Sequence, residues 1–411
     1  MIRKRITAMI AAFALIMTLT ACNGNNASVP ENDRNMWEST GRVMEIAKTP
    51  DKNLKLWDVL PEIPETPAAE LEYAMLADGS GLDVSGYKGT GNAVRIPETI
   101  DGTKVVSIRF SEVNIEELIL PTTVEYARVY NCPIKYLNVP CDEIKIQMSY
   151  DLEKVYIEDN VTVISSGLFA REELLTQVRM GSSLKVIEGD AFQGCEALRE
   201  LEIPEGVEYI GDAFRYTNFT KLTLPSSLVA LHKEAFVLAS NDTVIEYNGK
   251  SYSRGDDELF RQFYPNDLLI YNNVVVDCRS YITEVNIPEG VTEIGDYALA
   301  FERDIVKITL PKSLRIIHDG AFNSCEALTE IVIPEGVEEL GALVFDGCKS
   351  LKKIDLPDSL TAVELSAFAD ISYTEEHGFT DFEVTYKGVT YTSSEEDIRE
   401  LLKQFERPAD D

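Results

Sequence analysis

The strongest constraint on the fold of this chain is a motif that returns every 23 residues. The motif has the form L-x-x-I-x-I-P-x-x-V-x-x-I-x-x-x-A-F-x-x-C. Four contiguous units span residues 282–304, 305–327, 328–350 and 351–373, and earlier units span residues 152–174, 175–197, 198–218 and 219–241. In the contiguous run, Pro288, Pro311, Pro334 and Pro357 are each 23 residues apart. Self-similarity at a short fixed period indicates a solenoid, in which each repeat forms one coil.

Each apolar position of the motif has a distinct structural role. Ile331 and Ile333 alternate with polar residues, which is typical of a β-strand. The proline that follows cannot donate a ladder hydrogen bond, so it ends the strand. Ala321 is small enough to allow a close turn, and the ring of Phe322 is expected to fill the middle of the coil. One unit cannot bury these residues alone, so we expect stacked units to share a continuous core.

The motif resembles the leucine-rich repeat in its BspA-like (Treponema-type) form, from about residue 71 to the C-terminus. The resemblance implies a leucine-rich-repeat solenoid that is mainly β with short helical turns and has a parallel sheet along one face. Upstream of residue 150 the repeat is irregular. There Pro97, Pro121, Pro140 and Glu158 are separated by 24, 19 and 18 residues.

The chain also contains a duplication longer than the 23-residue repeat. Residues 243–263 resemble residues 382–405, and Tyr247 and Tyr386 are 139 residues apart. Each copy is predicted to form a β-hairpin followed by a short amphipathic helix. The expected hairpin turns are Asn248-Gly249 and Lys387-Gly388. Since the end of a solenoid needs a polar-faced cap, we expect two repeat blocks that each end in a hairpin-plus-helix cap: block one, residues 71–264, and block two, residues 268–406.

The strand residues that point outward form the candidate binding face. These residues are Tyr136, Tyr156, Arg179, Glu200, Lys221, Glu284, Lys307, Glu330 and Lys353. In block two the charge of these residues alternates in sign from strand to strand. Opposite charges on neighbouring strands stabilise a sheet, and this effect is sufficient to explain the alternation. The functional alternative is a ligand surface around Tyr136, Tyr156 and Arg179, where aromatic and cationic groups gather.

The triplet Arg254, Gly255 and Asp256 resembles the RGD integrin-binding motif. A chain of this length contains such a triplet by chance on the order of one time in ten. Asp256 also precedes the helix of the first cap and suits its N-cap position. We therefore favour a structural role over integrin binding.

The N-terminus predicts the location of the protein. Arg3, Lys4 and Arg5 precede an apolar run over residues 6–19, and Cys22 follows Leu19-Thr20-Ala21. This pattern indicates a signal peptide over residues 1–21 and resembles bacterial lipoprotein signals, which implies cleavage before Cys22 and lipidation of its sulfur. The apolar run is short for a membrane span. Residues 22–70 are expected to be the lipidated cysteine and a tether. Trp37 and Trp57 either dock on the first coil, which we favour, or contact a partner.

The charge and the cysteines narrow the possible partners and environment. The formal net charge of −32 excludes nucleic acid as a partner. Such a surface favours cationic proteins or divalent ions, although solubility alone explains it. Cys195, Cys325 and Cys348 share one interior repeat position. Parallel side chains on adjacent coils have poor disulfide geometry, so we expect buried free thiols.

No motif for catalysis stands out. His232, His318 and His377 lack zinc-ligand spacing, and no phosphate loop or nucleophile elbow is present, so we expect no enzyme, no metal and no cofactor.

The leading hypothesis is an extracytoplasmic lipoprotein, anchored to the outer face of the bacterial membrane and surface-exposed. Its repeat surface would bind a protein or glycan partner, for adhesion or another protein–protein interaction, as the resemblance implies. The alternative is a cell-envelope scaffold that docks on wall polymer or another secreted protein. A third hypothesis is that the chain is a substrate-capture or hydrolytic protein.

Overall fold

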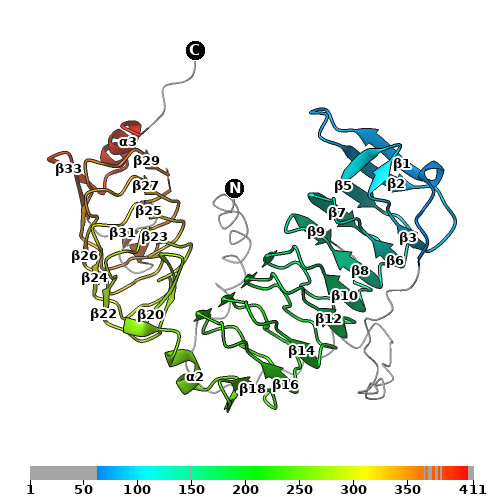
Figure 1. Cartoon of the computed structure of the whole chain (residues 1–411). Coiled ribbons are helices and arrows are strands. Elements are labelled where there is room, and N and C mark those ends of the chain that lie inside the picture. Colours follow the sequence, from blue (N-terminus) through cyan, green and yellow to red (C-terminus); the bar gives the residue numbers. More distant parts are fainter. Residues whose placement is uncertain are drawn as a thin grey trace. The chain divides into compact units, whose positions relative to one another are not determined.

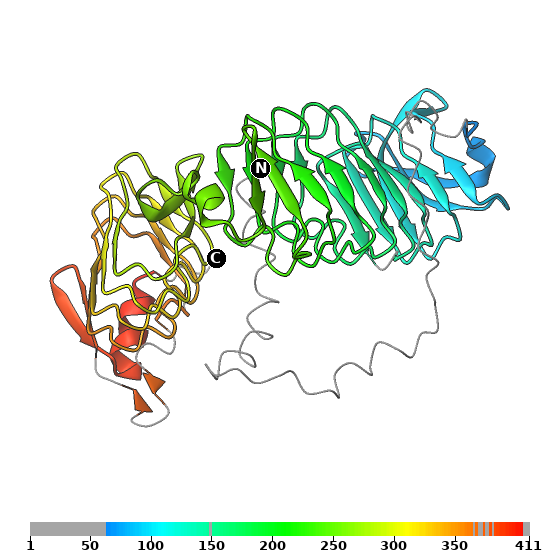
Figure 2. The same cartoon turned by 90° about the horizontal axis from the view of Figure 1, so that it is seen from below.

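The computed structural model describes residues 63–147, 150–364, 366–368, 373–374, 378–379 and 382–405. In this part of the chain the regular structure is almost entirely β, and the strands of successive coils lie side by side in parallel sheets (Figures 1 and 2). The predicted solenoid is therefore confirmed. The expected signal peptide, Cys22, both tryptophans and most of the tether lie outside the described residues.

Block one begins with a sheet that the repeat did not predict. Its strands, in sheet order, are β1 (Leu71–Met75), β2 (Leu82–Tyr87), β5 (Thr103–Ser111), β7 (Tyr126–Tyr130) and β9 (Ile144–Gln147), and β4 (Thr99–Ile100) pairs with β5. β1 and β2 form an antiparallel pair, and β2, β5, β7 and β9 pair in parallel. The antiparallel hairpin supplies the edge on which the first coils stack.

Each later coil adds one strand to each of two ladders. The longer ladder of block one consists of two sheets in line. The first contains β3 (Ala93–Arg95), β6 (Glu117–Ile119), β8 (Tyr136–Val139), β10 (Lys154–Ile157) and β12 (Gln177–Arg179), and the second contains β14 (Glu200–Glu202), β16 (Lys221–Thr223), β18 (Val244–Tyr247) and β19 (Lys250–Ser253). The second ladder contains β11 (Val163–Ile164), β13 (Val186–Ile187), β15 (Tyr209–Ile210) and β17 (Ala230–Leu231). The sequence predicted one parallel sheet, and the structure adds this second ladder of very short strands.

Block two repeats the arrangement. One ladder contains β20 (Leu268–Tyr271), β21 (Val274–Cys278), β23 (Glu293–Ile294), β25 (Ile316–Ile317), β27 (Glu339–Leu340) and β29 (Ala362–Val363). The other consists of two sheets in line: a pair, β22 (Glu284–Asn286) and β24 (Lys307–Thr309), and a sheet of β26 (Glu330–Val332), β28 (Lys353–Asp355), β32 (Glu383–Tyr386) and β33 (Val389–Thr392). β30 (Tyr373–Thr374) and β31 (Gly378–Phe379) form a separate hairpin. β20 and β21 are antiparallel, as β1 and β2 are, so both blocks begin with a hairpin.

The segments that carry the Ala-Phe pair are hydrogen-bonded turns. The backbone N–H of Phe192 donates to the carbonyl of Ala213 at 2.9 Å, and that of Phe214 donates to the carbonyl of Ala235 at 3.0 Å. Because these donors bind the neighbouring coil, they cannot form the bonds of a helix within their own coil. The segments expected to form short helical turns are therefore turns whose N–H groups bond to the neighbouring coil.

Stacked phenylalanines fill the centre of the coils. In block one Phe169, Phe192, Phe214 and Phe236 are buried, and consecutive ring centroids lie 5.2, 5.7 and 5.9 Å apart. In block two the centroids of Phe322, Phe345 and Phe368 lie 5.9 and 6.2 Å apart. Stacked aromatic pairs contribute roughly 0.5–1.5 kcal/mol beyond their burial. The interior position predicted for Phe322 is confirmed.

The buried cysteines join one coil to the next without a disulfide. The thiol of Cys195 donates to the carbonyl of Phe169 at 3.2 Å, that of Cys325 donates to the carbonyl of Leu299 at 3.2 Å, and that of Cys348 donates to the carbonyl of Phe322 at 3.1 Å. All three thiols are free, as expected. Burial raises the pKa of Cys348 to about 12, so this thiol keeps its proton and remains a donor.

Both predicted caps are present as a hairpin and a helix. The first hairpin, β18–β19, turns at Asn248 and Gly249 with φ angles of 49° and 76°. This is the left-handed backbone that a two-residue hairpin turn requires. The helices that follow are α2 (Asp257–Arg261) and α3 (Glu395–Lys403). Short 3₁₀ segments lie at Ala68–Glu70 (η5) and Pro265–Asp267 (η6).

The two caps also pack in the same way. The ring of Tyr247 packs in a tilted arrangement against that of Phe263 with a centroid distance of 5.3 Å, and its counterpart Tyr386 packs in the same way against Phe405 at 5.1 Å. The buried apolar residues form two clusters, one from Leu71 to Leu269 and one from Leu268 to Leu402. Each cap therefore covers the last coil of its own cluster.

Replacement of Phe322 by Ala should lower the free energy of unfolding by about 3–5 kcal/mol, because the buried ring leaves a cavity between two coils. Urea unfolding of the two chains measures this difference. Phe301→Ala is a matched control, since this ring lies one coil earlier and is 54% exposed. An equal loss in both variants would show that the ring stack is not the core of the fold.

Candidate functional site

The outward ladder of block one brings the predicted aromatic and cationic residues together. On adjacent strands, Tyr156 lies opposite Arg179, and Tyr136 lies opposite Lys154. The guanidinium of Arg179 is 5.3 Å from the ring centroid of Tyr156, and the ammonium of Lys154 is 5.0 Å from that of Tyr136. Both rings are half-buried, and Arg179 is exposed. We name Tyr136, Lys154, Tyr156 and Arg179 the cation–aromatic patch.

Neighbouring groups fix the properties of this patch. Asn138, which lies opposite Tyr156, is buried, and its side chain accepts from the N–H of Leu120 at 2.6 Å and donates to the carbonyl of Leu120 at 2.8 Å. Burial and the nearby carboxylate of Glu158 raise the pKa of Tyr156, so its hydroxyl stays protonated and remains a donor. The patch therefore presents ring faces, cations and a phenol on a rigid sheet. This is the chemistry of a recognition surface.

The charge-alternating part of the ladder has the expected register. Glu200 lies opposite Lys221, Glu284 opposite Lys307, and Glu330 opposite Lys353. The ammonium of Lys221, however, lies 2.8 Å from Glu246, and that of Lys353 lies 2.8 Å from Asp355. The sequence thus predicted the opposed positions, while these two lysines form their close ion pairs elsewhere. Exposed pairs of this kind contribute at most about 1 kcal/mol each.

The RGD triplet takes part in the first cap. The guanidinium of Arg254 donates to the side-chain oxygen of Asn241 at 3.1 and 2.6 Å. The carboxylate of Asp256 accepts from the N–H of Glu258 at 3.0 Å and caps α2, as predicted. Both charged residues of the triplet thus have structural partners in the cap, and Gly255 is exposed between them.

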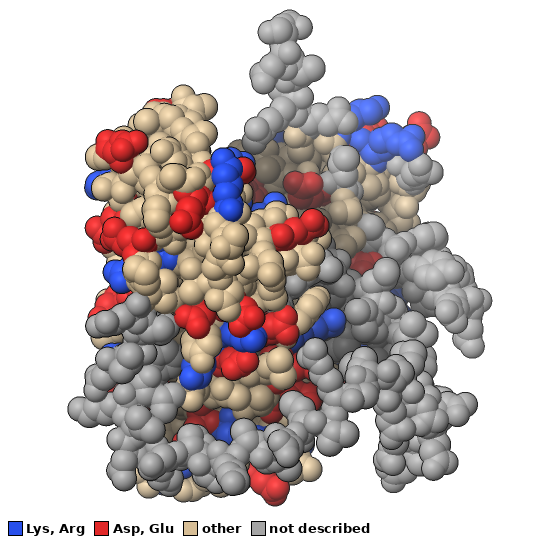
Figure 3. Space-filling view, turned by 90° about the vertical axis from the view of Figure 1, so that its right-hand side faces the viewer, with Lys and Arg blue, Asp and Glu red and all other residues tan. Residues whose placement is uncertain are grey.

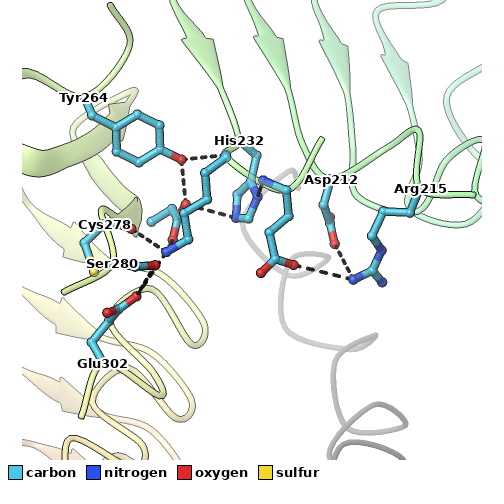
Figure 4. A network of polar contacts seen from close by, with 10 residues as sticks. Asp212, Arg215, His232, Tyr264, Cys278, Ser280 and Glu302 are labelled. Carbon is cyan, nitrogen blue, oxygen red and sulfur yellow. Dashed lines mark hydrogen bonds and ion pairs between the residues drawn. The ribbon is translucent and has the colours of Figure 1, made fainter. Parts of the chain in front are cut away.

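The half-buried Lys233 lies where the first cap meets the first coil of block two, and its partners Tyr264, Cys278 and Glu302 are labelled in Figure 4. The ammonium of Lys233 is 2.5 Å from the carbonyl of Cys278 and 3.1 Å from the carboxylates of both Asp277 and Glu302. Burial opposes its charge, but the carboxylate of Asp277 and then that of Glu302 raise the pKa of Lys233 above its usual range. The lysine therefore remains charged. It binds Cys278 and Glu302, which follow it in the sequence by 45 and 69 residues.

A tyrosine and a histidine complete this junction network. The hydroxyl of Tyr264 donates to Asp277 at 2.5 Å and accepts from the N–H of Lys233 at 2.7 Å. His232 lies 3.4 Å from the same carboxylate. The network could not be predicted from the sequence, because its members do not recur at a fixed spacing. Its satisfied geometry indicates a structural role, since a buried charge is stable only when it is paired.

Arg215, also shown in Figure 4, is surrounded by carboxylates. Its guanidinium lies 2.8 Å from Asp190, 3.5 Å from Asp212 and 3.6 Å from Glu234. Burial, together with the charge of Asp212, raises the pKa of Asp190. These acids come from consecutive coils, and the arginine compensates their mutual repulsion.

Comparison with known families identifies the repeat. Residues 92–195, 147–261 and 269–378 match the model of the BspA type leucine-rich repeat region, in six copies. The chain belongs to this family. The expected resemblance is thus confirmed over most of both blocks.

Several solved structures are similar to this BspA-type chain. A leucine-rich repeat protein from Eubacterium ventriosum is 20% identical, with 72% of this chain and 76% of that chain covered and a TM-score of 0.31. The pneumococcal vaccine antigen PcpA is 17% identical, with 82% and 94% covered and a TM-score of 0.31. A leucine-rich cell surface protein from Faecalibacterium prausnitzii is 19% identical, with 75% and 93% covered and a TM-score of 0.26. No curated protein matches the sequence.

The described part of this BspA-type solenoid shows no metal site. Within it, no group of three or more His, Cys, Asp and Glu side chains is arranged to hold a metal ion. A pocket of about 560 Å³ is lined by Lys104, Val106, Thr122, Thr123, Val124, Glu125, Cys141, Asp142 and Asn160. None of the carboxyl groups with a raised pKa lines it. On the face shown in Figure 3, acidic side chains are scattered among basic and uncharged ones.

One of those carboxyl groups replaces a cysteine of the repeat. Glu172 follows Phe169 by three residues, as Cys195 follows Phe192. The side chain is 4% exposed, and its Oε2 atom has no hydrogen-bond partner. Burial raises the pKa of Glu172 from 4.5 to about 7. The alignment of the repeats could have revealed this buried acid, because every aligned neighbour at the position is interior.

The raised pKa makes stability depend on pH. The contribution of neutral Glu172 is fully present below about pH 4.5 and is lost as the pH rises through about 7, because the unfolded state releases the proton first. Glu172→Gln should therefore gain stability over the natural chain between pH 5 and pH 8, by on the order of 3 kcal/mol. Urea unfolding at both pH values measures this gain. Glu173→Gln, at the exposed neighbour, should show no such gain, and equal behaviour of the two variants would refute the buried acid.

Proposed function

We propose that the protein is an extracytoplasmic binding protein whose cation–aromatic patch contacts a macromolecular partner, either a protein or a glycan. The observation that carries this proposal is the pairing of Tyr136 with Lys154 and of Tyr156 with Arg179 on consecutive coils. Tyrosine and arginine dominate the binding energy of many protein interfaces, because they bury large, fairly rigid groups. Strands that are held in register on both sides keep these groups pre-organised, which lowers the entropy cost of binding.

The position of the patch within the ladder supports this proposal. In block two the outward residues alternate between acids and lysines, which stability and solubility explain. In block one the same ladder carries rings beside cations. Both rings are only half-buried, so each keeps part of its surface available to a partner.

We propose that the chain is anchored at the outer face of the bacterial membrane through Cys22. The basic residues, the apolar run and the cysteine of the N-terminus support this anchor, and two acyl chains give stable attachment. Residues 22–70 would then hold the two repeat blocks, 71–264 and 268–406, away from the lipid. Among the described residues, no helix has the length and hydropathy to cross a bilayer.

Adhesion to another cell or to a matrix component is the role that we favour for this surface. The alternative, a scaffold docked on wall polymer or on another secreted protein, differs in its exposure on whole cells. Protease treatment of intact cells separates the two, because an adhesin is cleaved and a scaffold under the wall is protected. We do not favour the hydrolytic hypothesis, since Glu172 is buried inside a coil and Asp190 is paired with Arg215.

Replacement of Arg179 or Tyr156 by Ala should weaken binding to the partner at least tenfold, as expected for truncation of an interface hot spot. The measurement is binding of the full chain to an array of matrix proteins, mucin glycans and peptidoglycan fragments at low and high salt. Lys307→Ala is the matched control, since this exposed lysine lies on the equivalent ladder of block two. A chain that tolerates both block-one changes but loses binding with Lys307→Ala would contradict the assignment.

A further inference from the structure

The sheet that opens block one carries a row of cations that the repeat does not explain. Arg109 of β5 lies directly opposite Arg128 of β7, and Arg128 lies directly opposite Lys145 of β9. All three side chains are exposed. We name Arg109, Arg128 and Lys145 the cationic row. It lies on a different sheet from the cation–aromatic patch.

Folding stability accounts for Arg109, which pairs with the buried carboxylate of Asp83, but not for the neighbouring like charges of Arg128 and Lys145. Like charges directly opposite each other on neighbouring strands destabilise a sheet. The other described strand pairs avoid this arrangement, for example where Glu200 lies opposite Lys221. The sequence has 70 acidic residues from which a partner could be drawn. Three adjacent cations in a chain of net charge −32 therefore indicate a function that outweighs their repulsion.

One end of the row is held in a fixed orientation. The guanidinium of Arg109 donates from Nε to both oxygens of Asp83 at 3.0 Å and from a terminal nitrogen at 2.5 Å. The carboxylate of Asp83 is buried and also accepts from the hydroxyl of Ser107 at 2.6 Å. Asp83 neutralises one charge, but it occupies only one edge of the guanidinium. The remaining N–H groups of a planar fork are left for a second anion.

Uncharged groups flank the row on both sides. Tyr126 and Tyr130 lie two residues before and after Arg128 on the same face of β7, and both rings are half-buried. Ser111 and Gln147 lie opposite Tyr130 on the neighbouring strands. The acidic residues nearest in sequence, Glu112, Glu125 and Glu143, stand just outside the ends of the strands. A ligand along the row therefore meets cations at its centre and rings, a hydroxyl and an amide at its sides.

From this pattern we propose that the cationic row binds an anionic polysaccharide that runs across β5, β7 and β9. Cations on adjacent strands repeat at about 4.8 Å, which is close to the length of one sugar residue in an extended chain. Carboxylates or sulfates on successive sugars would meet successive cations, the tyrosine rings would stack on the apolar faces of the sugars, and Ser111 and Gln147 would bind hydroxyls.

An acidic polypeptide fits the same row less well. Side chains on one side of an extended peptide repeat every two residues, at about 6.6–6.8 Å, and therefore fall out of step with the cations. The proposal is independent of the cation–aromatic patch, because the two surfaces share no residue. Loss of one surface should leave binding at the other unchanged.

The test uses the full chain and four polymers: dextran sulfate, polygalacturonate, uncharged dextran and poly-L-glutamate. We expect saturable binding of dextran sulfate or polygalacturonate that weakens as salt is added, at least tenfold tighter than binding of dextran or polyglutamate. The comparison of the first two polymers shows whether sulfate or carboxylate is preferred.

Three single-residue variants test whether the cationic row is the binding site. Arg128→Gln should weaken binding of the preferred polymer at least tenfold, with a melting temperature equal to or above that of the natural chain, because a like-charge contact is removed. Tyr130→Leu keeps every charge and should weaken the same polymer severalfold. Lys353→Gln, at an exposed lysine of block two, should bind as the natural chain does.

Three results would overturn the proposal. The first is binding that Arg128→Gln leaves unchanged. The second is polyglutamate bound as tightly as the polysaccharides, which would indicate an acidic protein partner instead. The third is that none of the four polymers binds.

Discussion

The structure depends on the hydrogen-bonded stacking of each coil on the next. A coil of this size cannot bury its own apolar residues, so its strands, its phenylalanine and its cysteine all find their partners on neighbouring coils. The thiol of Cys325 donates to the carbonyl of Leu299 one coil earlier, and Phe322 stacks on Phe345 one coil later. The ends of the stack lack one neighbour, which explains why each block begins and ends with an antiparallel hairpin.

This constraint leaves only the outward side chains for function. Inward positions are determined by packing, and exceptions such as Glu172 carry a cost in desolvation. Outward positions are free to vary, and they differ between the longer ladder and the opening sheet of block one. The longer ladder places rings beside cations at Tyr156 and Arg179, whereas the opening sheet aligns cations at Arg109 and Arg128. A single fold can thus offer two surfaces of different chemistry.

The regular repeat made much of the fold predictable from sequence. A spacing of 23 residues fixes which residues are opposed, so the register of Glu284 with Lys307 followed directly. The opening sheet could not be predicted, because the spacing there is irregular and β1 and β2 lie outside the repeat. The network around Lys233 was also invisible, since its partners lie 45 and 69 residues away and belong to no motif. The candidate patch was predicted by residue type, but its cation–π geometry depends on strand register and side-chain conformation together.

The most direct test of the stacking account is removal of one whole unit, residues 305–327, followed by thermal unfolding monitored by circular dichroism. If coils are interchangeable, β22 then pairs with β26, and Cys348 takes the place of Cys325 beside the carbonyl of Leu299. The account predicts a β-rich chain that still unfolds in a cooperative transition, at a somewhat lower temperature. Loss of the cooperative transition would show that the coils are not equivalent stacking units and would contradict the account.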